Sequence, residues 1–233
     1  MNILLYYAME EESKKTIEHF DFAEINNNSP LPYKLYKKNI HDNVVYLTNS
    51  GIDPRFKVNS VGTIPAALTV YELAKSLNIN LVINPGTAGG FLTRGGKIGD
   101  IYLATKVLFH HRNIPMGPYE PYGIGEYQAY DFSQLSESLT FKTGVFSSSD
   151  SLTCNDEEMS FFNENKVVVK EMEAAAIAYI CEILKIPYLG VKSITDIVDG
   201  GRITSEEFLE NLEKASHNLQ QFLSKLLKIF PKS

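Results

Sequence analysis

The chain has 233 residues, a formal net charge of -6 and 44% hydrophobic residues, which is the composition of a soluble globular protein. The acidic balance, without a basic stripe that carries interleaved aromatic residues, argues against a nucleic-acid partner. No apolar stretch approaches the length of a membrane span, so we expect no membrane association. There is no internal repeat, low-complexity tract or linker, and we expect residues 1–233 to form a single domain.

The cysteines and the N-terminus indicate the compartment. Cys154 and Cys181 match no metal-binding spacing, so we expect free thiols in a reducing environment. Met1-Asn2 leads directly into a short apolar run, without a basic flank or a small-residue cleavage site. This start is typical of a first strand and not of a signal peptide. We therefore expect a cytoplasmic protein.

The first half of the chain alternates apolar runs with helical patterns. The acidic residues Glu10, Glu11 and Glu12 stand where a helix begins, and the helix dipole alone would explain them. The expected elements are a strand over 3–7, a helix from Glu10, a hairpin over 35–40 and 44–48, a helix from Gly62 or Thr63, and a short strand over 81–84 that ends in a Gly-rich turn over 85–90.

The second half continues the alternation and ends in a long helix. Thr204 and Glu207 have the spacing of a capping box at its start. The expected elements are a strand over 101–109, an irregular loop or lid over 116–130, a strand over 142–147, a short helix over 156–162, and a C-terminal helix whose buried stripe is Phe208, Leu212, Ala215, Leu219, Phe222 and Leu226.

The stretch 167–200 is the centre of the functional prediction. Its apolar runs at 167–169 and 188–194 have the length of buried strands, and an alanine-rich helix lies between them. This pattern predicts a β-α-β unit with parallel strands. Ligands of open α/β sheets gather beyond the carboxyl ends of such strands. Glu173 and Asp196 lie at these ends, so we expect them to face one crevice.

Two other motifs are ambiguous by themselves. The glycines of 85–90 would let backbone amides approach a ligand, or they would simply form a tight turn; the segment has neither the P-loop lysine nor the spacing of a dinucleotide fingerprint. His110-His111 suggests a metal, but no third ligand stands at a useful spacing. We expect no metal site.

Several motifs together resemble a known family. They are Ala8-Met9-Glu10-Glu11-Glu12, Asn84 to Gly90, Glu171-Met172-Glu173-Ala174 and Ser193-Ile194-Thr195-Asp196. In this order they resemble the nucleoside phosphorylase/nucleosidase superfamily and, within it, the 5′-methylthioadenosine nucleosidases. The sequences VGT at 61–63 and TDIVDG at 195–200 are more similar to the plant-type enzymes than to the bacterial dual-specificity enzymes.

The resemblance implies a fold and an activity. The fold would be a three-layer α/β/α arrangement around a mixed, partly barrel-like sheet, and the protein would be a homodimer. The substrate would be a small-molecule nucleoside, 5′-methylthioadenosine, hydrolysed at its N-glycosidic bond to adenine and 5-methylthioribose. No metal or organic cofactor is implied.

The chemistry explains why acids are needed. Adenine must gain a proton as it leaves, and Asp196 matches the family's general acid. The sugar passes through an oxocarbenium-like state, and Glu12 matches the base that activates water. Glu173 matches the ligand of the ribose hydroxyls, with Met172 against the sugar ring. The implied substrate contacts also include Met9; Thr87 and Gly89 at the floor; Leu152 and Thr153 along adenine; and Ile114 and Pro115 over the methylthio group, from this subunit or its partner.

Each of these residues also has a structural explanation. Asp196 could cap a turn, Glu173 could be a charge at a helix start, and Met172 and Leu152 could fill the core. The sequence around Glu12 separates two enzyme classes. Phosphorylases of the superfamily carry a Gly-x-Pro-x-Arg loop after the first strand and an Arg before the Gly-rich segment, where this chain has Met9 to Glu12 and Asn84.

Carboxylates repel phosphate, so the charge favours hydrolysis over a purine nucleoside phosphorylase. A non-catalytic nucleoside-binding or storage protein is the remaining alternative, and the retained acids disfavour it. Cleavage of S-adenosylhomocysteine stays open, because Lys192 replaces an Arg of the dual-specificity relatives; we expect a preference for 5′-methylthioadenosine.

Overall fold

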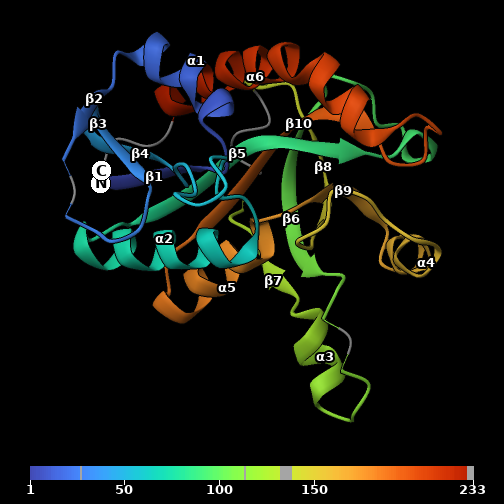
Figure 1. The fold of residues 1–233 in the computed structure, drawn as a ribbon. Coiled ribbons are helices and arrows are strands. Elements are labelled where there is room, and N and C mark those ends of the chain that lie inside the picture. The colour runs from blue at the N-terminus through green and yellow to red at the C-terminus, as the bar shows by residue number, and fades with distance from the viewer. Residues whose placement is uncertain (27, 113, 132–137, 230–233) are drawn as a thin grey trace.

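A mixed β-sheet forms the middle layer of the protein (Figure 1). The computed structural model describes residues 1–26, 28–112, 114–131 and 138–229. Within these residues the strands are β1 (Asn2–Tyr7), β2 (Ala23–Ile25), β3 (Lys34–Ile40), β4 (Asn43–Asn49), β5 (Leu81–Gly90), β6 (Ile101–Phe109), β7 (Tyr127–Gln128), β8 (Lys142–Ser148), β9 (Val167–Glu171) and β10 (Tyr188–Ile197).

Part of this sheet closes on itself. The strand order is β10-β6-β8-β9-β5-β1-β4-β3-β2, and β5 also pairs with β10. The circuit β5-β10-β6-β8-β9 is therefore closed, while β1, β4, β3 and β2 extend from β5 as an open sheet. The mixed, partly barrel-like sheet expected from the resemblance is confirmed.

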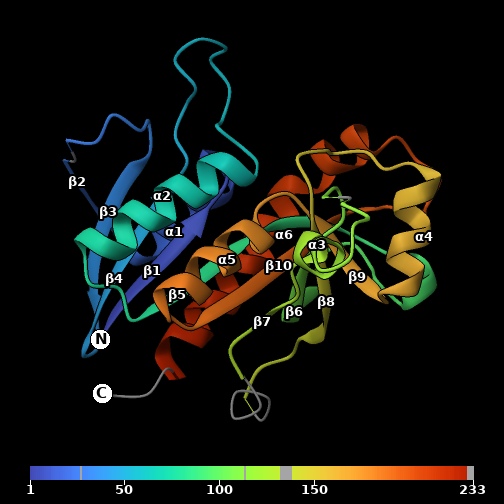
Figure 2. The ribbon, with the colours of Figure 1, turned by 90° about the horizontal axis from the view of Figure 1, so that it is seen from below.

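Helices cover both faces of the sheet. In Figures 1 and 2, α1 (Glu10–Phe20) and α6 (Thr204–Ile229) lie on one face, and α2 (Thr63–Ser76) and α5 (Ala174–Leu184) lie on the other. The shorter helices α3 (Tyr119–Ile124) and α4 (Asp156–Glu164) lie at the side of the barrel, and the 3-10 turn η1 covers Leu92–Arg94. The three-layer α/β/α prediction is confirmed. None of the described helices combines the length and apolar character that a membrane crossing needs.

Sequence pattern explains why the layers pack. The strand residues Leu4, Val82 and Val169 are fully buried, as expected for strands covered on both faces. Helix α5 begins with consecutive alanines at 174–176, whose small side chains let α2 and β8 approach closely. The predicted hairpin over β3 and β4 is antiparallel, as expected.

One topological prediction is wrong. Strands β9 and β10 are not parallel neighbours: β10 pairs with β5 in parallel, whereas β9 pairs with β5 antiparallel at Gly89 and Gly90. The helix between them crosses part of a closed barrel, so the strand that follows it, β10, pairs with β5 on the opposite side from β9. Local pattern cannot distinguish this arrangement from an ordinary β-α-β unit.

The Gly-rich segment is also not a turn. Strand β5 continues through Pro85 to Gly90. A Cβ on Gly90 would lie 3.0 Å from the Ile194 side chain, and a Cβ on Gly86 would lie 3.0 Å from Lys192 Nζ. These glycines make room for side chains of the neighbouring strand, so the close approach they permit is inside the sheet.

Three smaller predictions differ from the structure. The region 116–130, expected to be irregular, contains α3 and β7. Glu207 does not close a capping box with Thr204, because its Oε2 accepts the N–H of Ile197 at 2.9 Å. Phe208 is only half-buried and lines a pocket, so it does not belong to the core stripe of α6.

Candidate active site

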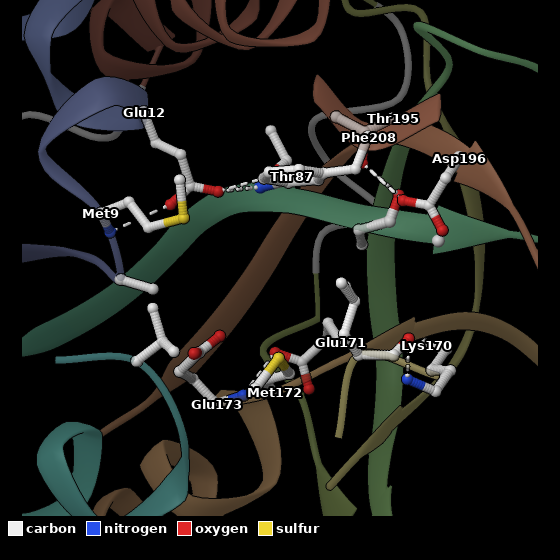
Figure 3. A pocket seen from close by; sticks show the side chains of 15 residues that line it. Met9, Glu12, Thr87, Lys170, Glu171, Met172, Glu173, Thr195, Asp196 and Phe208 are labelled. Carbon is white, nitrogen blue, oxygen red and sulfur yellow. Dashed lines mark hydrogen bonds between the residues drawn. The ribbon is translucent and has the colours of Figure 1, made fainter. Parts of the chain in front are cut away.

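A pocket of about 260 Å³ lies where β5, β9 and β10 end (Figure 3). Gly89 of β5 lines this pocket, and Lys170 of β9 and Asp196 of β10 are both in register with it. The crevice predicted between Glu173 and Asp196 is therefore present, although the strands converge by a different topology. The carboxyl groups in the described lining belong to Glu12, Glu171, Glu173 and Asp196.

Glu12 occupies one end of the pocket. Its Oε1 accepts hydrogen bonds from the backbone N–H and the hydroxyl of Thr87, each at 2.6 Å, and its Oε2 accepts the N–H of Met9 at 3.3 Å. Burial raises the pKa of Glu12 above its ordinary value, while the Lys192 charge and these donors oppose the rise. A carboxylate that accepts several donors is suited to remain ionised as a base.

The helix-start explanation holds for the two neighbours of Glu12 and not for Glu12 itself. Glu10 forms an ion pair with Lys34 at 2.7 Å, and Glu11 accepts the side-chain amide of Asn59 at 2.9 Å. Both carboxylates lie outside the pocket lining, whereas Glu12 is 3% exposed and points into it. Helix α1 therefore contributes a single acid to the site.

Glu173 lies below Glu12 in Figure 3, at the start of α5. Its Oε1 accepts the N–H of Gly62 at 2.9 Å. Burial and the neighbouring Glu171 raise the pKa of Glu173 well above its ordinary value, and Lys192 opposes this. A buried carboxyl with an accessible face toward the pocket can accept hydroxyl donors from a sugar.

Glu171, which is paired with Lys192, fixes the backbone at Glu173. Glu171 Oε2 accepts the backbone N–H groups of Glu173 and Ala174 at 2.9 and 2.8 Å, and it lies 3.4 Å from Lys192 Nζ. The other Glu171 oxygen accepts the hydroxyl of Ser148. This carboxylate therefore fixes the first turn of α5 and with it the position of Glu173.

Asp196 occupies the opposite end of the pocket from Glu12 (Figure 3). The Thr195 hydroxyl donates to its Oδ1 at 2.8 Å. Burial raises the pKa of Asp196, the Thr195 hydroxyl and the Lys170 charge oppose the rise, and Glu207 adds to it. Asp196 has fewer donors than Glu12, so its environment suits a carboxylic acid that keeps its proton for donation.

This arrangement separates a base from an acid across one cavity. Two carboxyl groups in contrasting environments can act on opposite sides of a scissile glycosidic bond. Among the described residues, no cluster of three or more His, Cys, Asp or Glu side chains is arranged to hold a metal. His110 is explained locally: it bonds to Ser147, and burial with the charges of Lys170 and His111 lowers its pKa to about 3.

The sequence is similar to those of known proteins. A model of the phosphorylase superfamily matches residues 2–228. An Arabidopsis thaliana 5′-methylthioadenosine nucleosidase is 35% identical to this chain, and the match covers 97% of this chain and 86% of that protein. An Arabidopsis thaliana 5′-methylthioadenosine/S-adenosylhomocysteine nucleosidase is 36% identical, and the match covers 97% of this chain and 90% of that protein. The chain belongs to the phosphorylase superfamily. It lies in the 5′-methylthioadenosine nucleosidase branch, as the resemblance implied.

The solved structure of the Arabidopsis thaliana 5′-methylthioadenosine nucleosidase in apo form supports this placement within the superfamily. It superposes with a TM-score of 0.96 at 33% identity and covers 99% of this chain and 97% of that one. An agreement of this extent shows that the nucleosidase fold is present from the first strand to the last helix.

Most predicted site residues of this superfamily member meet in the pocket. Its lining includes Met9, Glu12, Thr87, Gly89, Leu152, Met172, Glu173 and Asp196. Thr153 does not line it: the residue is exposed, and its carbonyl accepts the Ser151 hydroxyl. Ile114 lines a different pocket beside α4, and Pro115 is exposed and lines none of the pockets found in the described part of the chain. Their predicted contact with the methylthio group would need a second subunit.

Sequence reasoning missed several lining residues. These are Ala8, Val61, Ala88, Lys170, Glu171, Thr195 and Phe208. The signal for Lys170 was present, since a lysine directly follows three valines in a strand and stands next to the Glu171 motif. Phe208 gave no such signal, because its spacing on α6 fits the buried stripe equally well.

Proposed function

We propose that this protein hydrolyses the N-glycosidic bond of 5′-methylthioadenosine, releasing adenine and 5-methylthioribose. The observation that carries the proposal is the pair Glu12 and Asp196 at opposite ends of one pocket, with Glu173 beside it. The similarity to the two Arabidopsis nucleosidases supports the choice of substrate.

The steps follow from the environment of each acid. Asp196 gives its proton to N7 of adenine while the bond between N9 and C1′ breaks, so adenine leaves as a neutral molecule. Glu173 holds the ribose hydroxyls while positive charge develops on the sugar ring. Glu12 takes a proton from water, whose oxygen forms the new bond to C1′. Before the next turnover Glu12 releases the proton that it took from water to the solvent, and Asp196 regains one from the solvent.

Water is a better nucleophile for this site than phosphate. A phosphate dianion beside the sugar would meet the Glu12 carboxylate, and repulsion between like charges would oppose its binding. Asn84, which stands where phosphorylases carry an Arg, is fully buried and donates to the carbonyl of Tyr6 at 3.0 Å. It is therefore directed into the sheet and away from the pocket.

The test is adenine release from 5′-methylthioadenosine by the purified protein in phosphate-free buffer, repeated with added phosphate. We expect release at the same rate in both buffers, with 5-methylthioribose as the second product. Release only with phosphate, together with a sugar 1-phosphate, would assign the protein to the phosphorylases. Nucleoside binding without release would identify a binding protein.

S-Adenosylhomocysteine is the second substrate to compare, because one of the Arabidopsis relatives is named for both compounds. The pocket lining includes Met9, Val61 and Phe208, which suit an apolar methylthio group. A zwitterionic homocysteine tail would need polar partners. We therefore propose a higher kcat/KM for 5′-methylthioadenosine; equal values for the two substrates would contradict it.

We also propose that the active form is a homodimer. Helix α2 and the segment before it expose large apolar side chains: Phe56, Val58, Ile64, Leu68 and Tyr71. Large apolar side chains exposed on one segment and its adjoining helix are typical of a protein–protein contact. A second copy at this face would lie next to Val61 at the pocket, which is where Ile114 and Pro115 of a partner would be useful.

A further inference from the structure

Lys170 is an exception in its own strand. It follows Val167, Val168 and Val169 in β9 and is only 5% exposed. Lysine is almost never buried to this extent without a partner, because removing the ammonium group from water is energetically unfavourable. An apolar residue would fit this strand equally well, so the buried charge needs an explanation.

Its ammonium group holds the loop that borders the pocket. Lys170 Nζ donates to the carbonyl oxygens of Ser151 at 2.5 Å and of Leu152 at 2.9 Å. Both bonds join β9 to the segment between β8 and α4, and Leu152 lines the pocket while its side chain is 42% exposed. Ser149 and Asp150 are held separately, by the Glu171 carbonyl and by Thr63. Lys170 is therefore the anchor of the following residues, Ser151 and Leu152.

The same side chain lies near Asp196. Both residues are in register with Gly89, one on each side of β5. A Cβ on Gly89 would lie 2.8 Å from Asp196 Oδ2, so the glycine leaves this space open. In Figure 3, Lys170 and Asp196 are both on the side of the pocket that is opposite Glu12 and Met9, with Asp196 above the cavity and Lys170 below it.

We propose that Lys170 is a positioning residue at the end of the pocket where Asp196 would protonate adenine. Its ammonium group holds the 151–152 backbone in place and stabilises the carboxylate that Asp196 becomes once it has donated its proton. The proposal rests on the proposed function, because it concerns the acid that protonates the leaving base.

The charged surroundings support a direct effect on Asp196. From β9, Lys170 lowers the pKa of Asp196, and from α6, Glu207 raises it. Burial lowers the pKa of Lys170, and the negative charges of neighbouring acidic groups oppose this decrease. The titratable groups that interact with Lys170 are Cys154, Glu158, Glu171, His110 and Asp196.

The sign of the effect can be derived. Without the positive charge of Lys170 the pKa of Asp196 rises, so the acid keeps its proton to higher pH but donates it less readily. The basic limb of the kcat/KM profile should therefore move to higher pH while its plateau falls about threefold to tenfold, as Brønsted behaviour requires. A role confined to packing would lower the plateau and leave the limb where it was.

The first experiment needs no turnover. Protein with ¹³C-labelled aspartate carboxyl groups is titrated by NMR, and the Asp196 resonance is assigned by its loss in Asp196→Asn. The Asp196 carboxyl group should titrate at higher pH in Lys170→Gln and Lys170→Met than in the unaltered protein. In Lys170→Arg its titration should not move. If the Gln and Arg variants titrate alike, the electrostatic part of the proposal is overturned.

Adenine binding measured by calorimetry tests the loop contact. The Gln and Arg variants keep a donor for the 151–152 carbonyls, so their Kd should stay within about threefold of the unaltered protein, whereas Lys170→Met should bind at least about tenfold more weakly. Equal Kd values in all three variants would contradict the proposal that Lys170 holds the 151–152 backbone. A thermal melt of each variant shows which are folded; if Lys170→Met is not, Lys170→Ala, which also lacks a donor, replaces it in this binding test.

The pH profile of adenine release then separates the two proposals. A shifted limb in Lys170→Gln, restored in Lys170→Arg, supports the role of Lys170. Active variants with an unmoved limb overturn it and leave the nucleosidase proposal intact. If the unaltered protein releases no adenine while the NMR coupling is present, the proposed function fails and the Lys170–Asp196 interaction stands.

Discussion

Glu12 and Asp196 are both carboxylic acids, and their surroundings divide the work between them. Glu12 accepts hydrogen bonds from Met9 and Thr87 and lies near Lys192. Asp196 accepts one hydroxyl donor, and the like charge of Glu207 raises its pKa while the Lys170 charge lowers it. Residue identity alone does not assign base and acid. The number of donors around each carboxyl group does so.

Asp196→Asn removes the proton donor and keeps the shape of the side chain. We expect kcat/KM for adenine release to fall by about 10²- to 10⁴-fold, the usual contribution of general acid catalysis. Asp42→Asn, at an exposed position in the turn between β3 and β4, is the matched control and should retain activity. An active Asp196→Asn would assign the acid elsewhere.

Glu12 should set the acidic limb of the pH profile. Its pKa is raised by burial, so the base becomes protonated, and activity is lost, at a higher pH than for an ordinary glutamate. Steady-state rates from acidic to neutral pH measure this limb. Glu12→Gln should remove most of the activity, while Glu18→Gln, exposed on the same helix, should leave the profile unchanged. A limb at the ordinary glutamate pKa would contradict the prediction.

Glu173 should reduce stability at alkaline pH. Its pKa is raised in the folded state, so its contribution favours folding below the unfolded pKa and is lost as pH rises through the folded pKa. Glu173→Gln keeps an oxygen for the Gly62 N–H and removes the buried charge. We expect it to abolish turnover and to raise the free energy of unfolding at pH 9 by roughly 1–3 kcal/mol, with little change at pH 5.

Urea unfolding at the two pH values measures this difference. Glu182→Gln, an exposed position on α5, is the control and should unfold like the unaltered protein at both. A Glu173→Gln protein that is less stable at pH 9 would show that the carboxylate is stabilising there.

At the scale of elements, β5 is the strand on which the site is assembled. It joins the open sheet to the barrel, pairs with β10 and β9, and carries Thr87 and Gly89 at the pocket. Its glycines leave space that side chains from neighbouring strands occupy. Their positions therefore determine where Asp196 and Lys192 can lie.

Gly89→Ala tests this relation. The new Cβ would lie 2.7 Å from Val198 Cγ2 and 2.8 Å from Asp196 Oδ2, so the acid has to move. We expect kcat/KM to fall about 10²-fold through misplacement and the free energy of unfolding to fall by about 1–3 kcal/mol. Gly90→Ala, whose Cβ would lie nearest to the side chain of Ile194, should destabilise the protein by a similar amount with a much smaller loss of activity. Equal losses in the two variants would mean that packing alone is responsible.

At the scale of the whole molecule, the exposed face of α2 is the expected contact between two copies. Ile64, Leu68 and Tyr71 recur at helical spacing on this face, and Leu68 is 50% exposed. Leu68→Glu would place a charge in the proposed contact and should convert dimer to monomer in sedimentation experiments. Leu209→Glu, on the other helical layer at 70% exposure, should not. A Leu68→Glu protein that sediments like the Leu209→Glu control would place the contact elsewhere.

Local pattern was sufficient for most element types, and the resemblance to the nucleosidases identified the acids. Runs such as 101–109 and the stripe on α6 predicted their strand and helix, because side-chain periodicity reports which face is buried. The order of the acidic motifs was enough to name Glu12, Glu173 and Asp196 before the structure placed them in one pocket.

Only the tertiary structure decided how these pieces meet. Barrel closure placed β9 antiparallel to β5 and β10 parallel to it, which no local period reveals, because strand direction depends on pairing between distant segments. The same closure buried Lys170 beside the pocket. Sequence by itself determined which chemical groups are available; the closed sheet determined their neighbours, and the neighbours set the charge that each group carries.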